Sequence, residues 1–217
     1  MGPEPVRVWA IVLAAGQATR YGSDTPKQYE HLGGQRVLDW SIDAARRTCD
    51  GVVLVVAEAF AGAPEPGVDA VVVGGATRSA SVRSGLRVVP DDAEIVVVHD
   101  AARPLAGAAL FDTVIGRVAA GADGAVPGIP LTDTVKRVDD RGRVRETLDR
   151  AELVTVQTPQ AFRAGVLREA HRGEPEATDD AALVEELGST VVVVPGDPRN
   201  LKITFADDLR IAALHLT

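Results

Sequence analysis

The sequence predicts an α/β protein with a doubly wound, mostly parallel, Rossmann-like sheet and a projecting β-hairpin arm. Apolar runs rich in valine and isoleucine recur along all 217 residues, and segments with helical spacing lie between them. One stretch near the middle is polar and breaks this alternation. Strands buried on both faces lack polar alternation, and strands that alternate with helices form parallel sheets with right-handed crossovers.

Strands are predicted where apolar runs are bounded by glycine, proline or aspartate. These runs are residues 6–14, 52–57, 68–73, 94–99, 124–127 and 190–194. Helices are predicted where apolar residues return every three or four positions. These segments are residues 37–46, 78–88, 107–119, 164–171, 179–187 and a last helix that begins near Phe205.

Residues 130–158 form the exception. Two polar segments, residues 133–138 and 143–148, flank the turn sequence Asp-Asp-Arg-Gly, which is typical of a hairpin. The segments are too polar for the core, and an isolated hairpin needs a partner surface to be stable. We therefore predict one domain over residues 1–217, with residues 130–158 as an arm that pairs two copies into a homodimer.

The composition narrows the class of protein. Apolar residues make up 46% and charged residues 25% of the chain, which excludes a disordered or fibrous protein. A net charge of −8 argues against binding to nucleic acid or to a membrane surface. The single cysteine, Cys49, excludes a disulfide framework and a cysteine-rich zinc site. With no membrane-spanning run and no signal-peptide pattern, we expect a soluble cytoplasmic protein.

Lysine use is unusual, because only Lys27, Lys136 and Lys202 are lysines among 23 basic residues. Lysine carries a compact charge and arginine a planar fork, so the two are not interchangeable at a phosphate. Chance is the alternative explanation for each lysine. All three nevertheless fall within motifs that stand out independently.

The first motif follows the first strand as Leu-Ala-Ala-Gly-Gln-Ala-Thr-Arg-Tyr-Gly, with Pro-Lys-Gln soon after. A loop of small residues at the carboxyl edge of a sheet presents N–H groups to anions. It has neither G-x-G-x-x-G nor G-K-[ST], so a dinucleotide loop and a P-loop are both disfavoured. Arg20 and Lys27 supply the cations that a triphosphate under attack requires. The alternative is a tight turn with solvated basic residues.

The segments that follow two later strands are also candidates for ligand binding. In Gly-Gly-Ala-Thr-Arg-Ser-Ala-Ser-Val, the glycines allow close backbone approach and Ser81 begins a helix, although simple capping explains the pattern equally well. In His-Asp-Ala-Ala-Arg-Pro, Asp100 ends a buried strand, where a carboxylate must be paired or bound. Asp100 could meet a ribose hydroxyl or Mg²⁺, and Arg103 an anionic substrate; an Asp–Arg ion pair is the alternative. His99 is interpreted as structural.

The remaining candidates lie later in the chain. Thr134 and Lys136 lie in the hairpin, Arg150 follows it, Thr158 begins a predicted helix and Lys202 lies at a last sheet edge. Arg150, Thr158 and Lys202 could together hold a phosphate other than the nucleotide's. The aspartate pair at residues 179–180 is typical of a helix N-cap rather than of a metal site.

Taken together, the motifs resemble those of the 2-C-methyl-D-erythritol 4-phosphate cytidylyltransferase family, in the same order and over nearly the whole chain. The matching segments are residues 13–16, Arg20, 26–28, 74–86, 99–104, 133–136, 158–160 and 201–204. Pro-Lys-Gln and His-Asp-Ala-Ala-Arg-Pro are the most diagnostic.

The resemblance implies that CTP and 2-C-methyl-D-erythritol 4-phosphate react to give 4-diphosphocytidyl-2-C-methyl-D-erythritol and pyrophosphate. The acceptor's phosphate oxygen would attack the α-phosphorus in line, with Mg²⁺ held mainly by CTP oxygens and Asp100 as a candidate ligand. The absence of a convincing Ser/His or Cys/His arrangement agrees with such a reaction.

By motif, the resemblance also implies residue roles. Arg20 and Lys27 would stabilise the transition state, while Arg150 and Lys202 would position the acceptor's phosphate. The CTP site would comprise Ala14, Ala15, Gly16, Gly75, Ser81 and Asp100. The acceptor site would comprise Asp100, Arg103, Thr134, Arg150, Thr158 and Lys202. Family members are dimers with interlocking arms, so Thr134 and Arg150 would reach across the dimer.

The sequence departs from the family pattern at Ala18, where a second glycine is usual, and at Ala76, where a polar residue is more common. One rival is a sibling enzyme that shares the CTP loop and uses ribitol 5-phosphate or another polyol phosphate. A catalytically silent nucleotide-binding protein is the other rival. Arg20, Lys27 and Lys202 disfavour it.

Overall fold

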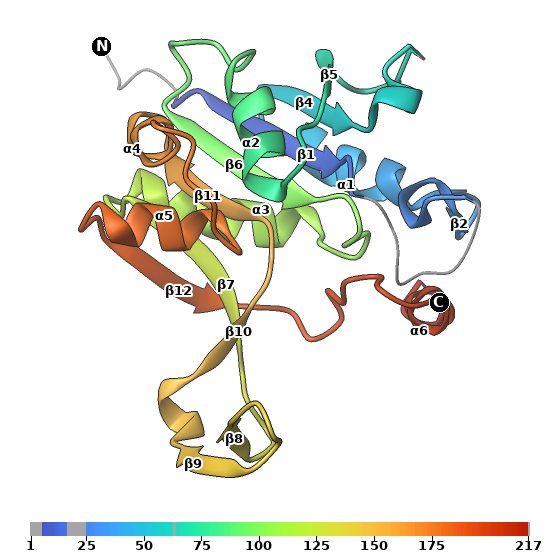
Figure 1. Ribbon diagram of the computed structural model, residues 1–217. Helices are drawn as coiled ribbons and strands as arrows, with labels where there is room; N and C mark the ends of the chain where they lie inside the picture. Colours follow the sequence, from blue (N-terminus) through green and yellow to red (C-terminus); the bar gives the residue numbers. More distant parts are fainter. Residues whose placement is uncertain (1–5, 17–24, 63, 217) are drawn as a thin grey trace.

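A computed structural model of the protein describes residues 6–16, 25–62 and 64–216 (Figure 1). The main sheet of this part of the chain has eight strands, in the order β10-β7-β11-β6-β1-β4-β5, with β12 paired to β7. The strands are β1 (Val8–Ala14), β4 (Gly51–Val56), β5 (Ala70–Val73), β6 (Ile95–Asp100), β7 (Gly124–Pro130), β10 (Val154–Val156), β11 (Gln160–Arg163) and β12 (Val191–Pro195). All pairings are parallel except those of β10 and β11. The predicted mostly parallel sheet is confirmed.

Helices cover both faces of the sheet. α1 (Val37–Arg46) and α3 (Ala108–Ala119) pack on one face. α2 (Arg78–Leu86), α4 (Ala164–Ala170) and α5 (Asp180–Glu186) pack on the other.

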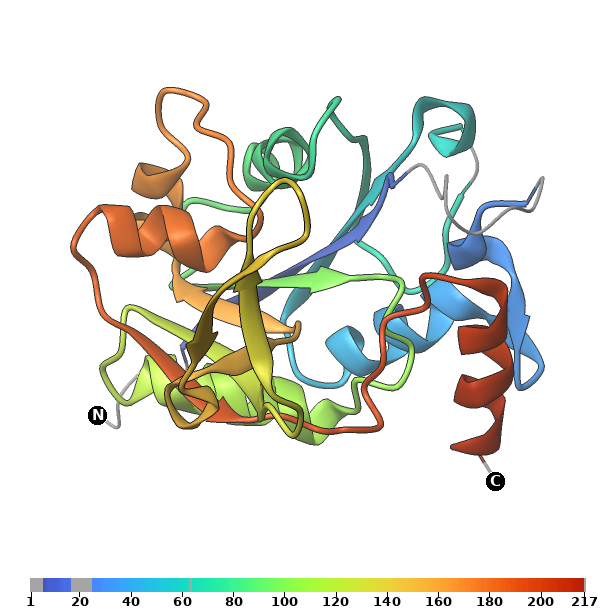
Figure 2. The same ribbon diagram turned by 60° about the horizontal axis from the view of Figure 1, so that its bottom comes forward.

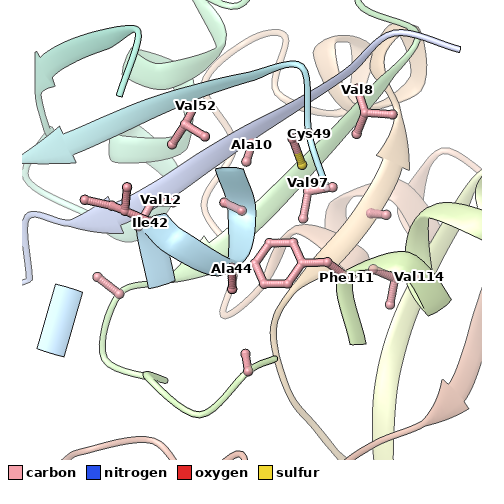
Figure 3. Close-up of a cluster of buried hydrophobic side chains, with 14 of the residues drawn as sticks. Val8, Ala10, Val12, Ile42, Ala44, Cys49, Val52, Val97, Phe111 and Val114 are labelled. Carbon is pink, nitrogen blue, oxygen red and sulfur yellow. The ribbon is translucent and has the colours of Figure 1, made fainter. Parts of the chain in front are cut away.

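Alternate side chains of β1 serve the two faces, as a buried strand requires. Val8, Ala10 and Val12 join the cluster that contains Phe111 (Figure 3), while Ile11 packs against Val82 of α2 on the opposite face. Because the apolar run of β1 has no polar alternation, the strand can contribute to both cores at once. The prediction of a doubly wound sheet, with helices on both faces, is therefore confirmed.

The prediction of a helix at Thr158 is wrong. A cis peptide bond joins Thr158 to Pro159, and the next residues form β11, which lies antiparallel between β6 and β7. Phe162 and Ala161 are fully buried there, so burial in the sheet prevails over a weak helical pattern. The helix begins only at Ala164. The predicted sheet edge at residues 200–204 is also wrong, because this segment is a loop.

The predicted hairpin is confirmed as β8 (Val135–Val138) and β9 (Val144–Leu148), which pair antiparallel. Figure 1 shows this pair at the bottom of the view, clear of the helical layers, and Figure 2 brings it forward. α6 (Ala206–Leu214) packs beside the small hairpin of β2 (His31–Leu32) and β3 (Gln35–Arg36). No helix in the described part of the chain is long and apolar enough to cross a membrane.

Candidate active site

A cavity of about 510 Å³ lies where β1 and β6 end, at the carboxyl edge of the sheet. The two strands are parallel neighbours, so their last residues lie side by side. Parallel sheets bind ligands at this edge. Eight of the residues predicted for the site line the cavity: Ala14, Ala15, Gly16, Lys27, Gly75, Ser81, Asp100 and Lys202. Arg20 and Ala18 lie outside the described residues.

The end of β1 is held by Gln28. Its side-chain amide is buried and donates to the carbonyl of Ala14 at 2.6 Å. Gln28 belongs to a 3₁₀ turn, η1 (Lys27–Tyr29), so the same contact also fixes the backbone of Lys27, which lines the cavity. The Pro-Lys-Gln motif thus combines a cation with its own anchor. Sequence reasoning recognised the motif without assigning a role to the glutamine.

The loop before α2 packs directly against the first loop. A Cβ atom on Gly74 would lie 2.4 Å from the Cβ of Ala15 and 2.8 Å from the hydroxyl of Ser81, so only glycine fits there. The Ser81 hydroxyl donates to the Thr77 carbonyl at 2.9 Å and accepts from the N–H of Gly75 at 3.2 Å. Thr77 caps the helix. Capping therefore accounts for much of this motif, while Gly75 and Ser81 still line the cavity.

Asp100 is the electrostatic centre of the cavity. Its carboxylate lies 2.6 Å from Nζ of Lys202 and 3.4 Å from Nε of Arg78. Burial alone would raise the pKa of Asp100, but the charges of Arg78 and Lys202 outweigh it and hold that pKa well below its usual range. The group is therefore a permanent anion with two cationic neighbours. The predicted internal pairing of Asp100 exists, but with Arg78 and Lys202 as its partners.

Arg78 is the residue that sequence reasoning missed. It occupies the first turn of α2, lines the cavity, and reaches Asp180 at 2.7 Å as well as Asp100. Asp100 lies 22 residues away and Asp180 lies 102 residues away, so no local pattern reveals these contacts. The available signal was an arginine in the first turn of a helix beside a double glycine.

Beneath Asp100 lies a buried chain of hydrogen bonds. The Thr158 hydroxyl accepts from the N–H of Asp100 at 3.0 Å and lies 3.1 Å from Nδ1 of His99. Nε2 of His99 lies 3.2 Å from the Ser41 hydroxyl. Burial lowers the pKa of His99 to about 4, so its ring is neutral. His99 is thus built into the fold, in agreement with its interpretation, and Thr158 supports Asp100 from below.

Other predicted residues are not among those that line the cavity. The Arg103 guanidinium donates to the carbonyl of Asn200 at 2.8 Å, and burial lowers its pKa. Thr134 and Arg150 lie on the arm, where Arg150 donates to the carbonyl of Thr132. Of Arg150, Thr158 and Lys202, only Lys202 lines the cavity of its own chain.

Lys136 also lies on the arm, where it donates to Thr147 at 2.6 Å across the hairpin. In the aspartate pair, Asp179 caps α5 by accepting from the N–H of Ala182, as predicted. Its neighbour Asp180 points inward and is fully buried. The two aspartates thus have different roles, and only the first is a helix cap.

The chain is similar to a well-populated group of enzymes. The family model of 2-C-methyl-D-erythritol 4-phosphate cytidylyltransferase matches residues 8–217. A protein of that name from Nocardia farcinica is 45% identical over 212 residues, covering 94% of this chain and 92% of the relative. A bifunctional enzyme IspD/IspF from Clavibacter michiganensis is 44% identical, covering 95% of this chain and 53% of the relative.

Solved structures agree with the sequence relatives. A 2-C-methyl-D-erythritol 4-phosphate cytidylyltransferase from Thermus thermophilus aligns with a TM-score of 0.81 at 35% identity, over 97% of this chain and 98% of that one. A 4-diphosphocytidyl-2C-methyl-D-erythritol synthase from Anaerococcus prevotii aligns with a TM-score of 0.82 at 28% identity, over 97% and 96% of the two chains.

Proposed function

This chain belongs to the 2-C-methyl-D-erythritol 4-phosphate cytidylyltransferase family, and from that membership we propose how its cavity carries out the transfer. The enzyme transfers the cytidylyl group of CTP to 2-C-methyl-D-erythritol 4-phosphate and releases pyrophosphate. One observation carries the proposed mechanism. A loop of small residues, the cation of Lys27 and the Lys202–Asp100 ion pair all meet in one cavity at the carboxyl edge of the sheet.

The reaction needs charge neutralisation and positioning rather than a base. A phosphate oxygen of the acceptor attacks the α-phosphorus of CTP, and the bond from that phosphorus to the bridging oxygen of pyrophosphate breaks as the new bond forms. The attacking oxygen already lacks a proton at neutral pH. The described residues that line the cavity include no histidine or cysteine, and Asp100 is held ionised by its cations. Proximity and preorganised charge then supply most of the rate acceleration.

We assign the nucleotide to the loops of β1 and α2. Ala14, Ala15, Gly16 and Gly75 have small side chains or none, which lets backbone N–H groups approach phosphate and base closely. Lys27, together with Arg20 from outside the described residues, neutralises the charge that develops on the triphosphate. The other end of the cavity, with Lys202 and Asp100, takes the acceptor.

The donor set fits a magnesium ion that CTP brings with it. Among the described residues, no three histidine, cysteine, aspartate or glutamate side chains lie close enough to hold a metal ion. Asp100 is the carboxylate that lines the described part of the cavity, and it faces two cations. Mg²⁺ prefers phosphate oxygens and water with few protein ligands. Bound to CTP, it would reduce the negative charge that the acceptor meets, with Asp100 as the candidate protein ligand.

We also propose that the arm joins two copies of the chain. Val138 and Val144 are 54% and 59% exposed on the hairpin, and Val154 and Val156 are exposed at its base. An apolar surface on a projecting hairpin favours burial against a second copy. In that dimer Thr134 and Arg150 would complete the partner's acceptor site, which accounts for their distance from the cavity of their own chain.

Two experiments test these assignments. In the first, pyrophosphate release is measured with CTP and Mg²⁺ and with either methylerythritol phosphate or ribitol 5-phosphate as acceptor. Turnover with methylerythritol phosphate alone is expected. Turnover with ribitol phosphate alone would keep the CTP loop and overturn the acceptor assignment.

The second experiment mixes impaired variants at a limiting concentration of methylerythritol phosphate, so that dimers can exchange chains. A mixed dimer of Lys27→Ala and Arg150→Ala contains one intact site if Arg150 acts across the dimer, so activity should return. A mixture of Lys27→Ala and Lys202→Ala is the matched control. Both of these side chains line the cavity of their own chain, so no intact site can form. Equal activity from the two mixtures would refute the exchange of arms.

A further inference from the structure

Arg78 has a hydrogen-bonding group that the fold leaves unused. Its Nε faces Asp100 and its Nη1 donates to Asp180, but its Nη2 is buried and has no hydrogen-bond partner in the described part of the chain. Buried donors are almost always paired, and an unpaired one costs stability. Because Arg78 also lines the cavity, the missing acceptor is to be sought in a ligand.

We propose that Arg78 is a further substrate-binding residue, whose Nη2 donates to a hydroxyl oxygen of the acceptor's carbon chain. Asp180 and His171 are positioning residues that hold this guanidinium in place. The inference rests on the function proposed for the cavity and adds a specificity contact to it.

The position of the guanidinium assigns it to the acceptor end. Arg78 starts from α2, beside the nucleotide loops, but its side chain extends to Asp100 at the end of β6 and to Asp180 at the start of α5. In the sheet, β6 lies on one side of β1 and β4 lies on the other. The guanidinium therefore shares the β6 side of the cavity with Lys202.

The local charge favours a hydroxyl over a phosphate as the ligand of Nη2. Two carboxylates, those of Asp100 and Asp180, already pair with the guanidinium of Arg78. A phosphate dianion gains little from a guanidinium whose charge two carboxylates already offset. A polyol needs donors and acceptors side by side, and Asp100 offers acceptor oxygens next to the free donor of Arg78. An acceptor of Asp100 beside a donor of Arg78 can also distinguish polyols by the positions of their hydroxyl groups.

The guanidinium is fixed from behind by a buried relay. Asp180 is fully buried, and its second oxygen lies 2.9 Å from Nε2 of His171. Both oxygens of Asp180 are therefore engaged, one by Arg78 and one by the histidine. His171 is itself buried at the end of α4. A side chain held by carboxylates on two elements loses little freedom when a ligand binds, which favours precise recognition.

The test compares Arg78→Lys with Arg83→Lys. Both arginines lie on α2 and both make two hydrogen bonds, since Arg83 donates to the carbonyl of Pro175 and to Glu176, but Arg83 does not line this cavity. Arg78→Lys should raise the KM for methylerythritol phosphate about tenfold or more, and the KM for CTP by no more than about twofold. Arg83→Lys should change neither. Thermal unfolding of both variants reports any shared structural loss.

Asp180→Asn is the second variant, and it decides the question if Arg78→Lys does not fold. It keeps an acceptor for Arg78 but weakens the clamp, so a smaller rise in the acceptor KM is expected with the CTP KM unchanged. An acceptor KM that stays constant while the melting temperature falls would overturn the proposal, as would an equal rise in both KM values. A wild-type enzyme that releases no pyrophosphate with either acceptor would instead refute the proposed function.

Discussion

Nζ of Lys202 lies 2.6 Å from Oδ2 of Asp100, although the two residues are 102 positions apart in the chain. The contact joins the last loop to the end of β6 and places a cation and an anion together in the cavity. The side chain of Lys202 is 42% exposed, whereas that of Asp100 is 12% exposed. The lysine can therefore turn on its flexible stem toward an incoming phosphate, while the carboxylate stays in place.

This contact predicts coupled effects of substitution. Lys202→Met and Asp100→Asn should each lower kcat/KM for the acceptor by about 10²-fold, since each removes one charged contact to the substrate. In the double variant the loss should be well short of the product of the two single losses, because residues in contact do not act independently. Initial rates at varied methylerythritol phosphate, measured for the wild type, the two single variants and the double variant, complete this double-mutant cycle. Strict additivity would show that the two groups act on separate parts of the substrate.

Lys27→Ala should lower kcat by about 10²- to 10³-fold, with a change in CTP affinity no larger than a few-fold. The reason is that charge on the transferred phosphoryl group grows in the transition state, so the contact strengthens there. Single-turnover rates and CTP titrations separate the two quantities. Arg172→Ala is a suitable control, since this cation is exposed and pairs with Glu169 at the surface. A normal kcat in Lys27→Ala would contradict its assignment.

Much of this fold could be predicted because it depends on patterns of neighbouring residues. The helix of residues 37–46 has the predicted bounds, because its apolar residues form one stripe that packs into one core. β11 was missed because it is four residues long and begins with a glutamine. Its identity as a strand depends on burial between β6 and β7, which no local pattern records.

The residues of the cavity likewise divide into those that a local sequence pattern predicts and those that only the folded chain brings together. The loop of residues 14–16 and Lys27 were predicted because a strand end followed by small residues is a local signal. The contacts of Arg78 were missed, because Asp100 and Asp180 approach it only in the folded chain. The roles of Thr134 and Arg150 remain predictions. They depend on a second copy of the chain, and neither residue meets the cavity of its own chain.

Arg150→Ala should raise the KM for methylerythritol phosphate far more than the KM for CTP, because the arm is assigned to the acceptor of the partner. Arg137→Ala is the matched control on the same hairpin, where Arg137 pairs with Glu146 across the strands. Exposed pairs of this kind contribute little to stability. Steady-state kinetics with each substrate varied in turn measures the effect. Equal rises in both KM values would contradict the acceptor-side placement.

Gly74→Ala should raise the KM for CTP and lower the melting temperature. The new Cβ would lie 2.4 Å from the Cβ of Ala15, so the two nucleotide loops would have to separate. Gly107→Ala is the control, because a Cβ there meets nothing within 4 Å. Isothermal titration with Mg²⁺–CTP and thermal unfolding give the two readouts. Wild-type affinity in Gly74→Ala would show that the loops move without cost to nucleotide binding.

The buried imidazole of His99 should make the protein less stable in mild acid. Burial lowers its pKa from 6.5 to about 4 in the folded state, so between these values the unfolded chain binds a proton that the folded chain does not. The free energy of unfolding must then fall as the pH falls, by about 2 to 3 kcal/mol between pH 7 and pH 4.5. Asp100 adds little in this window, because its ordinary pKa of 3.8 in the unfolded chain and its lowered pKa in the folded state both lie below pH 4.5. Urea unfolding at the two pH values measures the change. In His99→Gln, which keeps a polar side chain near Ser41 and Thr158 but cannot titrate, most of this pH dependence should disappear, and an undiminished slope would assign it to other groups.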